Sequence, residues 1–504
     1  MAREIQEMIA FIAYLVFVIG IGIYFFVKGR KMNQGEKGYF LGGRNMSGLV
    51  AGLSAGASDM SAWVLMGLPG SIYLWGMGQV WISVGLLLGT IAAWVFVAPK
   101  LRRYSIKADD AITIPQYLTR RFKTANPTLQ VICAIIFVVV YCVYSASSIY
   151  ACGTLFNTVF GWNETIAMVG ATVIILAYTF LGGFNAVCWT DFFQGLLMLA
   201  ALMAAPIVAV FVMNTSGFTP VAEVVTGPNY YNPLSSGQWD WDSIKDIISG
   251  LGWGLGYMGM PHILIRYMSI RSEKEMKKSR ITGIVWTTLI LTMASVVALV
   301  AHEFLGSLLQ EGSQKLVFIT MVRQIFPALL GGIFLAAILA ASMSTADSQL
   351  LASSSAFASD FYKPVIRKNA SDKEMLLAGR IVVALISIVA LLIAMNPNCQ
   401  GIMALVESAW AGFGAAFGPV ILLSLYWRRF TFKGAIAGIV AGFTVDVIWL
   451  IFLAGPTGIY EIIPGFFAGL LASVVVSLID KAPSKEVTDI FDEVKAMKKL
   501  PDEE

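Results

Sequence analysis

Long apolar stretches alternate with short polar loops along almost the whole chain. Each apolar stretch is long enough for an α-helix to cross the hydrocarbon core of a bilayer, which takes about 20 residues. The pattern predicts an all-α polytopic membrane protein with 13 transmembrane helices. The predicted spans are 5–27, 46–73, 77–98, 128–157, 164–184, 188–213, 243–266, 281–308, 320–352, 375–395, 400–426, 432–454 and 458–480.

Lysine and arginine gather in the loops on one side of the predicted membrane. The loops after the first, third, seventh, ninth and eleventh spans are basic, whereas the alternate loops nearly lack these residues. Because basic loops stay in the cytoplasm, we expect the N-terminus outside and the C-terminus inside a plasma (inner) membrane. The prediction is one transmembrane domain over 1–480 and a cytoplasmic tail over 481–504, either a solvated helix or a disordered end.

Composition narrows the functional classes. Charged residues make up 13% of the chain and mean hydropathy is +0.75, whereas soluble domains carry about 25% charged residues. The net charge of +4 is spread over many loops, which argues against nucleic acid as a partner. Five cysteines without a C-x-x-C pair and two histidines indicate neither a disulfide framework nor a zinc site. We expect no cofactor, no obligatory protein partner and no enzymatic activity.

A costly polar cluster interrupts the second span. The stretch LSAGASDMSAWVLMGLPG contains Asp59 together with Ser54, Ser58 and Ser61. A carboxylate at membrane depth costs roughly 2.5 to 3.5 kcal/mol on insertion scales, so such a group should face protein, water or an ion. The alternative is that the serines and glycines only allow close helix packing.

The seventh span is interrupted as well. Five glycines lie within Ser249–Met260, and Pro261 follows them, so an unbroken helix is not expected there. The second and seventh spans are five spans apart and run in opposite directions, as an inverted repeat of five plus five helices requires. Paired broken helices of this kind mark a transporter binding site, although two unrelated packing helices would give the same pattern.

The ninth span carries a third polar cluster. Ala341, Ser344 and Thr345 share one helical stripe, and hydroxyl and carbonyl oxygens with few charges suit sodium better than a divalent ion. Asp347 either adds a negative ligand or lies in water near the cytoplasmic end. Asp191 either follows an ion path or is a charge at a helix N-terminus, where the helix dipole favours it.

Two further acids in predicted spans stand apart from these clusters. Glu407 lies in the eleventh span and Asp446 in the twelfth. Neither has polar neighbours in the sequence from which a site can be built, so neither is assigned a role.

Five motifs follow one another along the chain: SAGASDMS, WTD, GWGLGYMGMPHI, ILAASMSTADSQLL and WAGFGAAFGP. In this order and spacing they resemble the sodium:solute symporter family, and within it the proline-transporting branch. The resemblance covers nearly the whole chain. It implies a leucine-transporter-like 5+5 inverted-repeat core over about 46–426, with extra helices over about 5–27, 432–454 and 458–480.

The resemblance also implies site residues. Asp59 matches an aspartate that supports sodium binding, and Asp191 matches one on the inward ion path; Asp347 departs from the family pattern and raises the question of a second ion or a proton. The implied sodium cage consists of Ala57, Met60, Ala341, Ser344 and Thr345. The implied substrate residues are Tyr144, Trp253, Tyr257 and Pro261, with Ser61 and Trp63 nearby.

These observations predict a symporter that uses Na+ as the coupling ion and L-proline as the substrate. Ala62 and Met260 depart from the family pattern beside the substrate residues, which bears on the selectivity for the amino acid. The alternatives are a symporter of the same family for pantothenate or another small carboxylate, and a non-transporting sensor or scaffold with the same fold.

Overall fold

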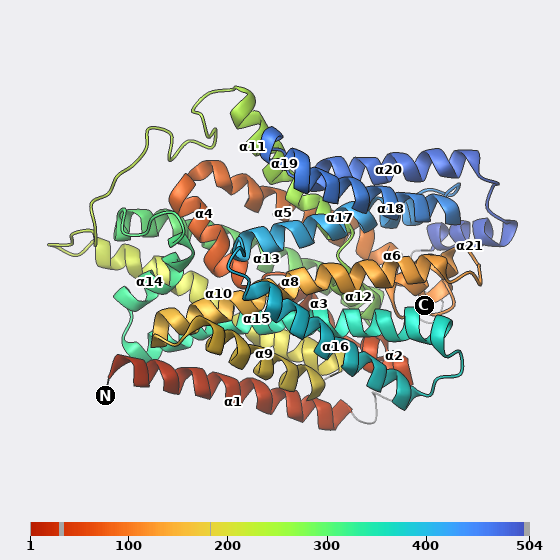
Figure 1. Ribbon diagram of the computed structural model, residues 1–504, viewed down its shortest axis with the longest axis horizontal. Coiled ribbons are helices and arrows are strands. Elements are labelled where there is room, and N and C mark those ends of the chain that lie inside the picture. The colour runs from red at the N-terminus through yellow and green to blue at the C-terminus, as the bar shows by residue number, and fades with distance from the viewer. Residues whose placement is uncertain (1, 30–34, 182, 498–504) are drawn as a thin grey trace.

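The computed structural model describes residues 2–29, 35–181 and 183–497. Within these ranges helices are the only extended regular elements, and a single isolated bridge pairs Met46 with Ile270. The long helices lie side by side along the long axis of the molecule (Figure 1). Arg30 and Lys31, two basic residues of the loop after the first predicted span, lie outside the described ranges.

Helices occupy all thirteen predicted segments. Ten are long and apolar enough to cross a membrane, judged over the described residues, and the second, fifth and seventh segments contain shorter helices; the count of thirteen crossings stays a prediction. The helices of these segments are α1 (Arg3–Gly29), α3 (Gly48–Ala57) with α4 (Leu68–Trp75), α5 (Val80–Ala92) with α6 (Ala98–Lys107), α8 (Thr128–Phe160), α9 (Glu164–Leu181), α10 (Phe184–Met213), α11 (Trp241–Gly252) with α12 (Pro261–Ser269), α13 (Glu273–Leu305), α15 (Ala328–Ala356), α16 (Asp372–Ala394), α17 (Ile402–Tyr426), α18 (Phe432–Ile448) with α19 (Ala454–Thr457), and α20 (Ile462–Ile479).

The predicted interruption of the second span is confirmed. Helix α3 ends at Ala57, and helical structure resumes at Trp63 as a wide-turn segment (Trp63–Gly67) that continues into α4. Gly56 lets α3 approach α13 closely, because a Cβ there would stand 2.5 Å from the Trp286 ring. Close packing therefore holds the end of α3 in place, and the turn that follows Ala57 contains the polar residues Ser58, Asp59 and Ser61.

The seventh span is also broken where the glycines predicted it. A tight 3-10 segment (Trp253–Met258) joins α11 to α12, and Pro261 is the first residue of α12. Gly254 packs directly on α5, since a Cβ at that position would lie 2.3 Å from the carbonyl oxygen of Gly85. Proline at the first helical position loses no intrahelical hydrogen bond, so the chain restarts a helix there without strain.

The ninth span begins later than predicted. Pro327 separates the short helix α14 (Val317–Ile325) from α15, and wide helical turns then extend α15 to Ile366. The apolar pattern alone gave a start at residue 320, because α14 is itself apolar.

The helices differ in their place within the bundle. In the most apolar window of each helix, 83% of residues are buried in α17 and 72% in α15, but only 22% in α1 and α18. Helix α1 runs along one side of the bundle, and α18 and α20 lie on the opposite side (Figure 1). The division into a core over about 46–426 and three extra helices stays a prediction.

The described part of the tail is helical. Helix α21 (Lys485–Ala496) buries Val487, Phe491 and Val494 against the end of the bundle, and Lys107 Nζ lies 2.5 Å from Glu493 Oε1. The tail is therefore a helix that packs on the bundle through one face, and the rest of it, from residue 498, lies outside the described residues.

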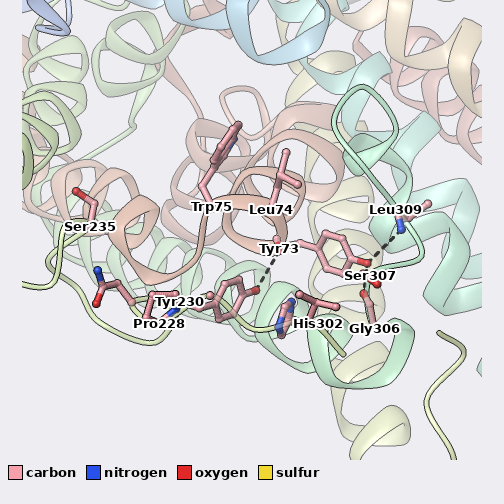
Figure 2. A pocket seen from close by; sticks show the side chains of 13 residues that line it. Tyr73, Leu74, Trp75, Pro228, Tyr230, Ser235, His302, Gly306, Ser307 and Leu309 are labelled. Carbon is pink, nitrogen blue, oxygen red and sulfur yellow. Dashed lines mark hydrogen bonds between the residues drawn. The ribbon is translucent and has the colours of Figure 1, made fainter. Parts of the chain in front are cut away.

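The connection from α10 to α11 covers the outer end of α4, on the predicted topology. Met77 donates its backbone N–H to Tyr230 over 2.7 Å, and the Tyr230 ring stacks on His302 with 3.9 Å between centroids. The Tyr73 hydroxyl donates to the Gly306 carbonyl. Tyr73, Tyr230, His302 and Gly306 line a cavity of about 350 Å³, whose surroundings are drawn in Figure 2.

Candidate functional site

The break in the second span is the meeting point of the predicted substrate residues. The carbonyl oxygen of Asp59 accepts hydrogen bonds from Ser61 N at 2.8 Å, Trp63 Nε1 at 3.2 Å and Tyr144 Oη at 3.4 Å. The Tyr257 hydroxyl donates to Asp59 Oδ2. Residues from α8, from the break after α3 and from the seventh-span break thus converge on Asp59, which is fully buried.

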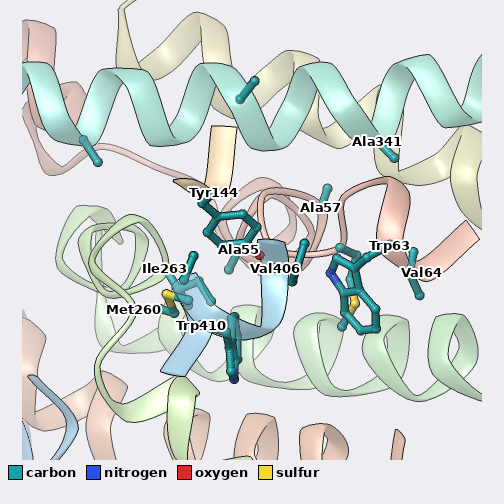
Figure 3. Packing of buried hydrophobic residues seen from close by; sticks show 14 of the residues in the cluster. Ala55, Ala57, Trp63, Val64, Tyr144, Met260, Ile263, Ala341, Val406 and Trp410 are labelled. Carbon is teal, nitrogen blue, oxygen red and sulfur yellow. The ribbon is translucent and has the colours of Figure 1, made fainter. Parts of the chain in front are cut away.

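Aromatic side chains enclose this point. The Trp63 and Trp253 rings lie 6.1 Å apart, and the Tyr257 ring meets Trp410 edge-on at 5.0 Å. Trp410 Nε1 donates to the Trp253 carbonyl over 2.7 Å, which ties α17 to the seventh-span break. Figure 3 shows Tyr144, Trp63 and Trp410 grouped around the broken second span.

The remaining predicted substrate residues shape the two breaks. Ser61 Oγ accepts the backbone N–H of Trp63 at 3.4 Å, and Pro261 begins α12. Met260, which departs from the family pattern, is fully buried in the same cluster. Helical ends therefore point at the centre of the bundle from both breaks, and a helix N-terminus favours negative charge.

Three members of the predicted sodium cage are joined by hydrogen bonds. Ser344 Oγ donates to the carbonyl of Ala57 over 2.8 Å, and its geometry also permits a bond to Ala341 at 3.1 Å. Thr345 Oγ1 is buried without a hydrogen-bond partner, and Met60 is buried in the break itself. Together these residues present neutral oxygen atoms at a buried position. A buried hydroxyl that has no hydrogen-bond partner within the protein is expected where that oxygen binds a cation.

Asp191 is not at a helix N-terminus, so that interpretation is wrong. Helix α10 begins at Phe184, two turns earlier, and Asp191 Oδ2 lies 2.8 Å from a guanidinium nitrogen of Arg266. Ser54 Oγ donates to the same carboxylate oxygen over 2.7 Å, and Arg266 Nε donates to Ser54 Oγ over 2.8 Å. The aspartate is therefore one half of a buried ion pair.

Asp347 does not lie in water, so the interpretation as a solvated residue near the cytoplasmic end is also wrong. It is fully buried, with Oδ1 at 3.5 Å from Ser348 Oγ and with Oδ2 unpartnered. Ser348 Oγ in turn accepts from Arg266 over 2.5 Å. The residue adds a second carboxyl group to the Asp191–Arg266 cluster, two residues after Thr345.

Arg266, Trp410 of α17 and Tyr460, whose ring lies 5.1 Å from that of Trp253, are the functional candidates that sequence reasoning missed. Arg266 is the last residue of the predicted seventh span, 243–266, and was assigned no role. Its position five residues after Pro261 was the available signal, because an ionisable residue inside a span needs a partner. A crevice of about 10 Å³ beside it is lined by Arg266, His262 and Ser348, which is about the least space that holds one water molecule.

Glu407 and Asp446 do have polar company, in contrast to the expectation. Both interact electrostatically with Glu461 at the start of α20. Glu461 is distant in the sequence, so only the fold brings the three acids together.

Known proteins resemble this chain over nearly its full length. Residues 39–442 match the family model described as "Sodium:solute symporter family". "Osmoregulated proline transporter OpuE" of Bacillus subtilis is 39% identical over 493 residues, covering 97% of this chain and 98% of the relative. "High-affinity proline transporter PutP" of the same organism is 43% identical over 460 residues, with 90% and 95% covered.

A third relative and a solved structure are also similar to this chain over nearly its full length. "Sodium/proline symporter 2" of Staphylococcus saprophyticus is 41% identical over 506 residues, covering 98% of this chain and 97% of the relative. The structure of a Na+-coupled sialic acid symporter superposes with a TM-score of 0.77 at 20% identity, covering 95% of this chain and 99% of that one. This likeness confirms the predicted leucine-transporter-like fold.

Proposed function

Since the chain belongs to the sodium:solute symporter family, we propose that it imports L-proline with Na+ across the plasma membrane by alternating access. The relatives named as proline transporters and sodium/proline symporters support the substrate and the ion. One structural observation carries the proposal. The break in the second span gathers Tyr144, Trp63 and Tyr257 around Asp59. Two residues before Asp59, at the start of the same break, the carbonyl of Ala57 accepts a hydrogen bond from Ser344.

The aromatic enclosure suits proline. L-Proline is a compact zwitterion with an apolar ring, so its pocket needs ring-sized walls and a few polar anchors. Trp63, Trp253 and Tyr257 provide the walls, and the start of α12 at Pro261 favours a carboxylate. The Asp59 carboxyl group, whose Oδ1 has no hydrogen-bond partner, is an acceptor for the substrate's ammonium group.

Sodium and proline are coupled through the second-span break. An ion bound by Ala57, Met60, Ala341, Ser344 and Thr345 fixes the end of α3 against α15. Asp59, which lies between Ala57 and Met60, then holds its carbonyl and carboxyl groups in the proline pocket. Each ligand therefore raises the affinity for the other, and this coupling is reciprocal.

The energetics of one sodium ion per proline are sufficient. A single charge moving through 100 mV releases about 2.3 kcal/mol. Each tenfold accumulation of substrate requires about 1.4 kcal/mol. The membrane potential alone thus supports more than tenfold accumulation.

The Asp191–Arg266 pair is proposed as a gate on the inward side. Arg266 joins α12 to α10, α3 and α15 through Asp191, Ser54 and Ser348. These elements come from both broken spans and from the sodium-binding helix, so release to the cytoplasm requires the pair to part. Asp347 lies beside it and repels Asp191 when both are ionised.

Uptake by the purified protein in proteoliposomes tests the proposal. An inwardly directed sodium gradient should drive accumulation of radiolabelled proline, and the same vesicles without the gradient should only equilibrate. Excess unlabelled proline should abolish uptake, whereas pantothenate should not compete. Accumulation without sodium, or stronger competition by pantothenate than by proline, would assign the chain to another solute or ion.

A further inference from the structure

A second polar cavity lies away from the proposed transport site, between the end of α16 and the starts of α17 and α20. Its volume is about 630 Å³, within the range of roughly 300 to 1,000 Å³ that is typical of small-molecule sites. The walls carry the carboxyl groups of Glu407 and Glu461, and one side is formed by the apolar residues Leu450 and Ile451. On the predicted topology the cavity opens at the outer face.

The acids of this cavity have no lysine or arginine partner in the described part of the chain. Glu461 is 3% exposed, and its Oε1 has no hydrogen-bond partner although the residue lines the cavity. Asp446, which does not line the cavity, is 2% exposed with Oδ1 unpartnered, and Glu461 repels both Asp446 and Glu407 when these acids are ionised. Within the described ranges none of the three forms an ion pair. An ionised acid that is buried without a partner is stabilised when a cation binds beside it.

The chemistry of the walls selects the kind of cation. Across the described residues no three Asp, Glu, His or Cys side chains are arranged to hold a metal ion. The apolar wall makes no favourable contact with a hydrated inorganic ion, but it can pack against the hydrocarbon part of an organic amine. We propose that the cavity binds a primary ammonium group, which the Glu461 and Glu407 carboxylates receive by charge-assisted hydrogen bonds.

Two sources can supply that ammonium group: the headgroup of an aminophospholipid and a soluble amine. Leu450 and Ile451 are 42% and 63% exposed on the rim, where lipid chains contact a membrane protein. A headgroup in the cavity would therefore leave its acyl chains along an apolar surface. A soluble amine would enter from the aqueous side instead.

One aromatic residue, Tyr460, connects this cavity to the proposed transport site. The Tyr460 hydroxyl donates to the Glu407 carbonyl over 2.8 Å, and the Tyr460 ring lies 5.1 Å from Trp253. Trp253 forms one wall of the proposed proline pocket. The ammonium site is thus placed to modulate transport, yet its existence does not depend on which solute is carried.

Cys399 provides a direct reporter, because it lines the cavity and the other four cysteines are buried. The purified protein is reconstituted in phosphatidylcholine, and the rate of Cys399 alkylation by a charged maleimide is measured. Ethanolamine at about ten times its dissociation constant should slow alkylation about tenfold. Replacing part of the lipid with phosphatidylethanolamine gives the second arm of the experiment.

Variants decide whether the carboxylates are responsible. Glu461→Gln should abolish the protection while leaving the unliganded alkylation rate unchanged, and Glu407→Gln, at a partly exposed position, tests the site again if the first variant fails to fold. Glu311→Gln removes an exposed acid elsewhere and should keep full protection. Protection by either ammonium source supports the proposal and identifies the source. The absence of protection in both arms, equal protection by Mg²⁺ alone, or protection that survives in Glu461→Gln would overturn it.

Discussion

Removing one partner of the Asp191–Arg266 pair should destabilise the protein far more than removing both. Asp191 is fully buried and Arg266 is 2% exposed, and 2.8 Å separates Asp191 Oδ2 from the guanidinium nitrogen. Breaking a buried pair from one side costs about 3 to 5 kcal/mol, because it leaves a charge without compensation. We therefore expect Arg266→Gln and Asp191→Asn each to lower the free energy of unfolding by about that amount.

The double variant measures the interaction itself. Since the neutral amides of Arg266→Gln and Asp191→Asn can hydrogen-bond to each other and to Ser54, the double variant should recover about 2 kcal/mol or more relative to the sum of the single effects. Reversible unfolding in mixed detergent micelles gives the four free energies. A matched control is Lys433→Gln with Asp480→Asn, an ion pair of 3.1 Å near the surface, which should show a coupling of about 1 kcal/mol or less. Additive losses at Asp191 and Arg266 would refute the reasoning.

Three further outcomes are expected. Ser344→Ala and Thr345→Ala should each raise the sodium concentration for half-maximal proline uptake, and unchanged sodium dependence in both would remove them from the cage. Tyr257→Ala should weaken proline binding, measured by equilibrium dialysis, far more than sodium binding; equal losses would make it a packing residue. Gly56→Ala should destabilise the protein by about 1 to 3 kcal/mol in micelle unfolding, because its Cβ would meet the Trp286 ring at 2.5 Å, and a stability equal to wild type would show that α13 gives way.

The sequence was sufficient to predict both helix breaks, because glycine, proline and intramembrane acids are local signals. The break at Asp59 and the restart of α12 at Pro261 lie where these residues predicted them. The start of α15 was placed wrongly, since hydropathy does not separate two apolar helices that are divided only at Pro327.

Long-range partners were beyond the reach of sequence patterns. Arg266 meets Asp191 across 75 positions, and no periodicity connects them, so the partner of that aspartate could not be inferred. The same holds for Glu461, which joins Glu407 only when the start of α20 packs beside the start of α17. The burial of Asp347 has the same origin, because burial depends on the helices that surround α15.

Binding of proline to the purified protein at increasing sodium concentration tests the central claim most directly, that one broken helix couples the two ligands. Sodium should lower the dissociation constant for proline, and proline should lower that for sodium by the same factor. In Ser344→Ala both effects should shrink together. A proline affinity that does not change with sodium in the wild-type protein would contradict the account.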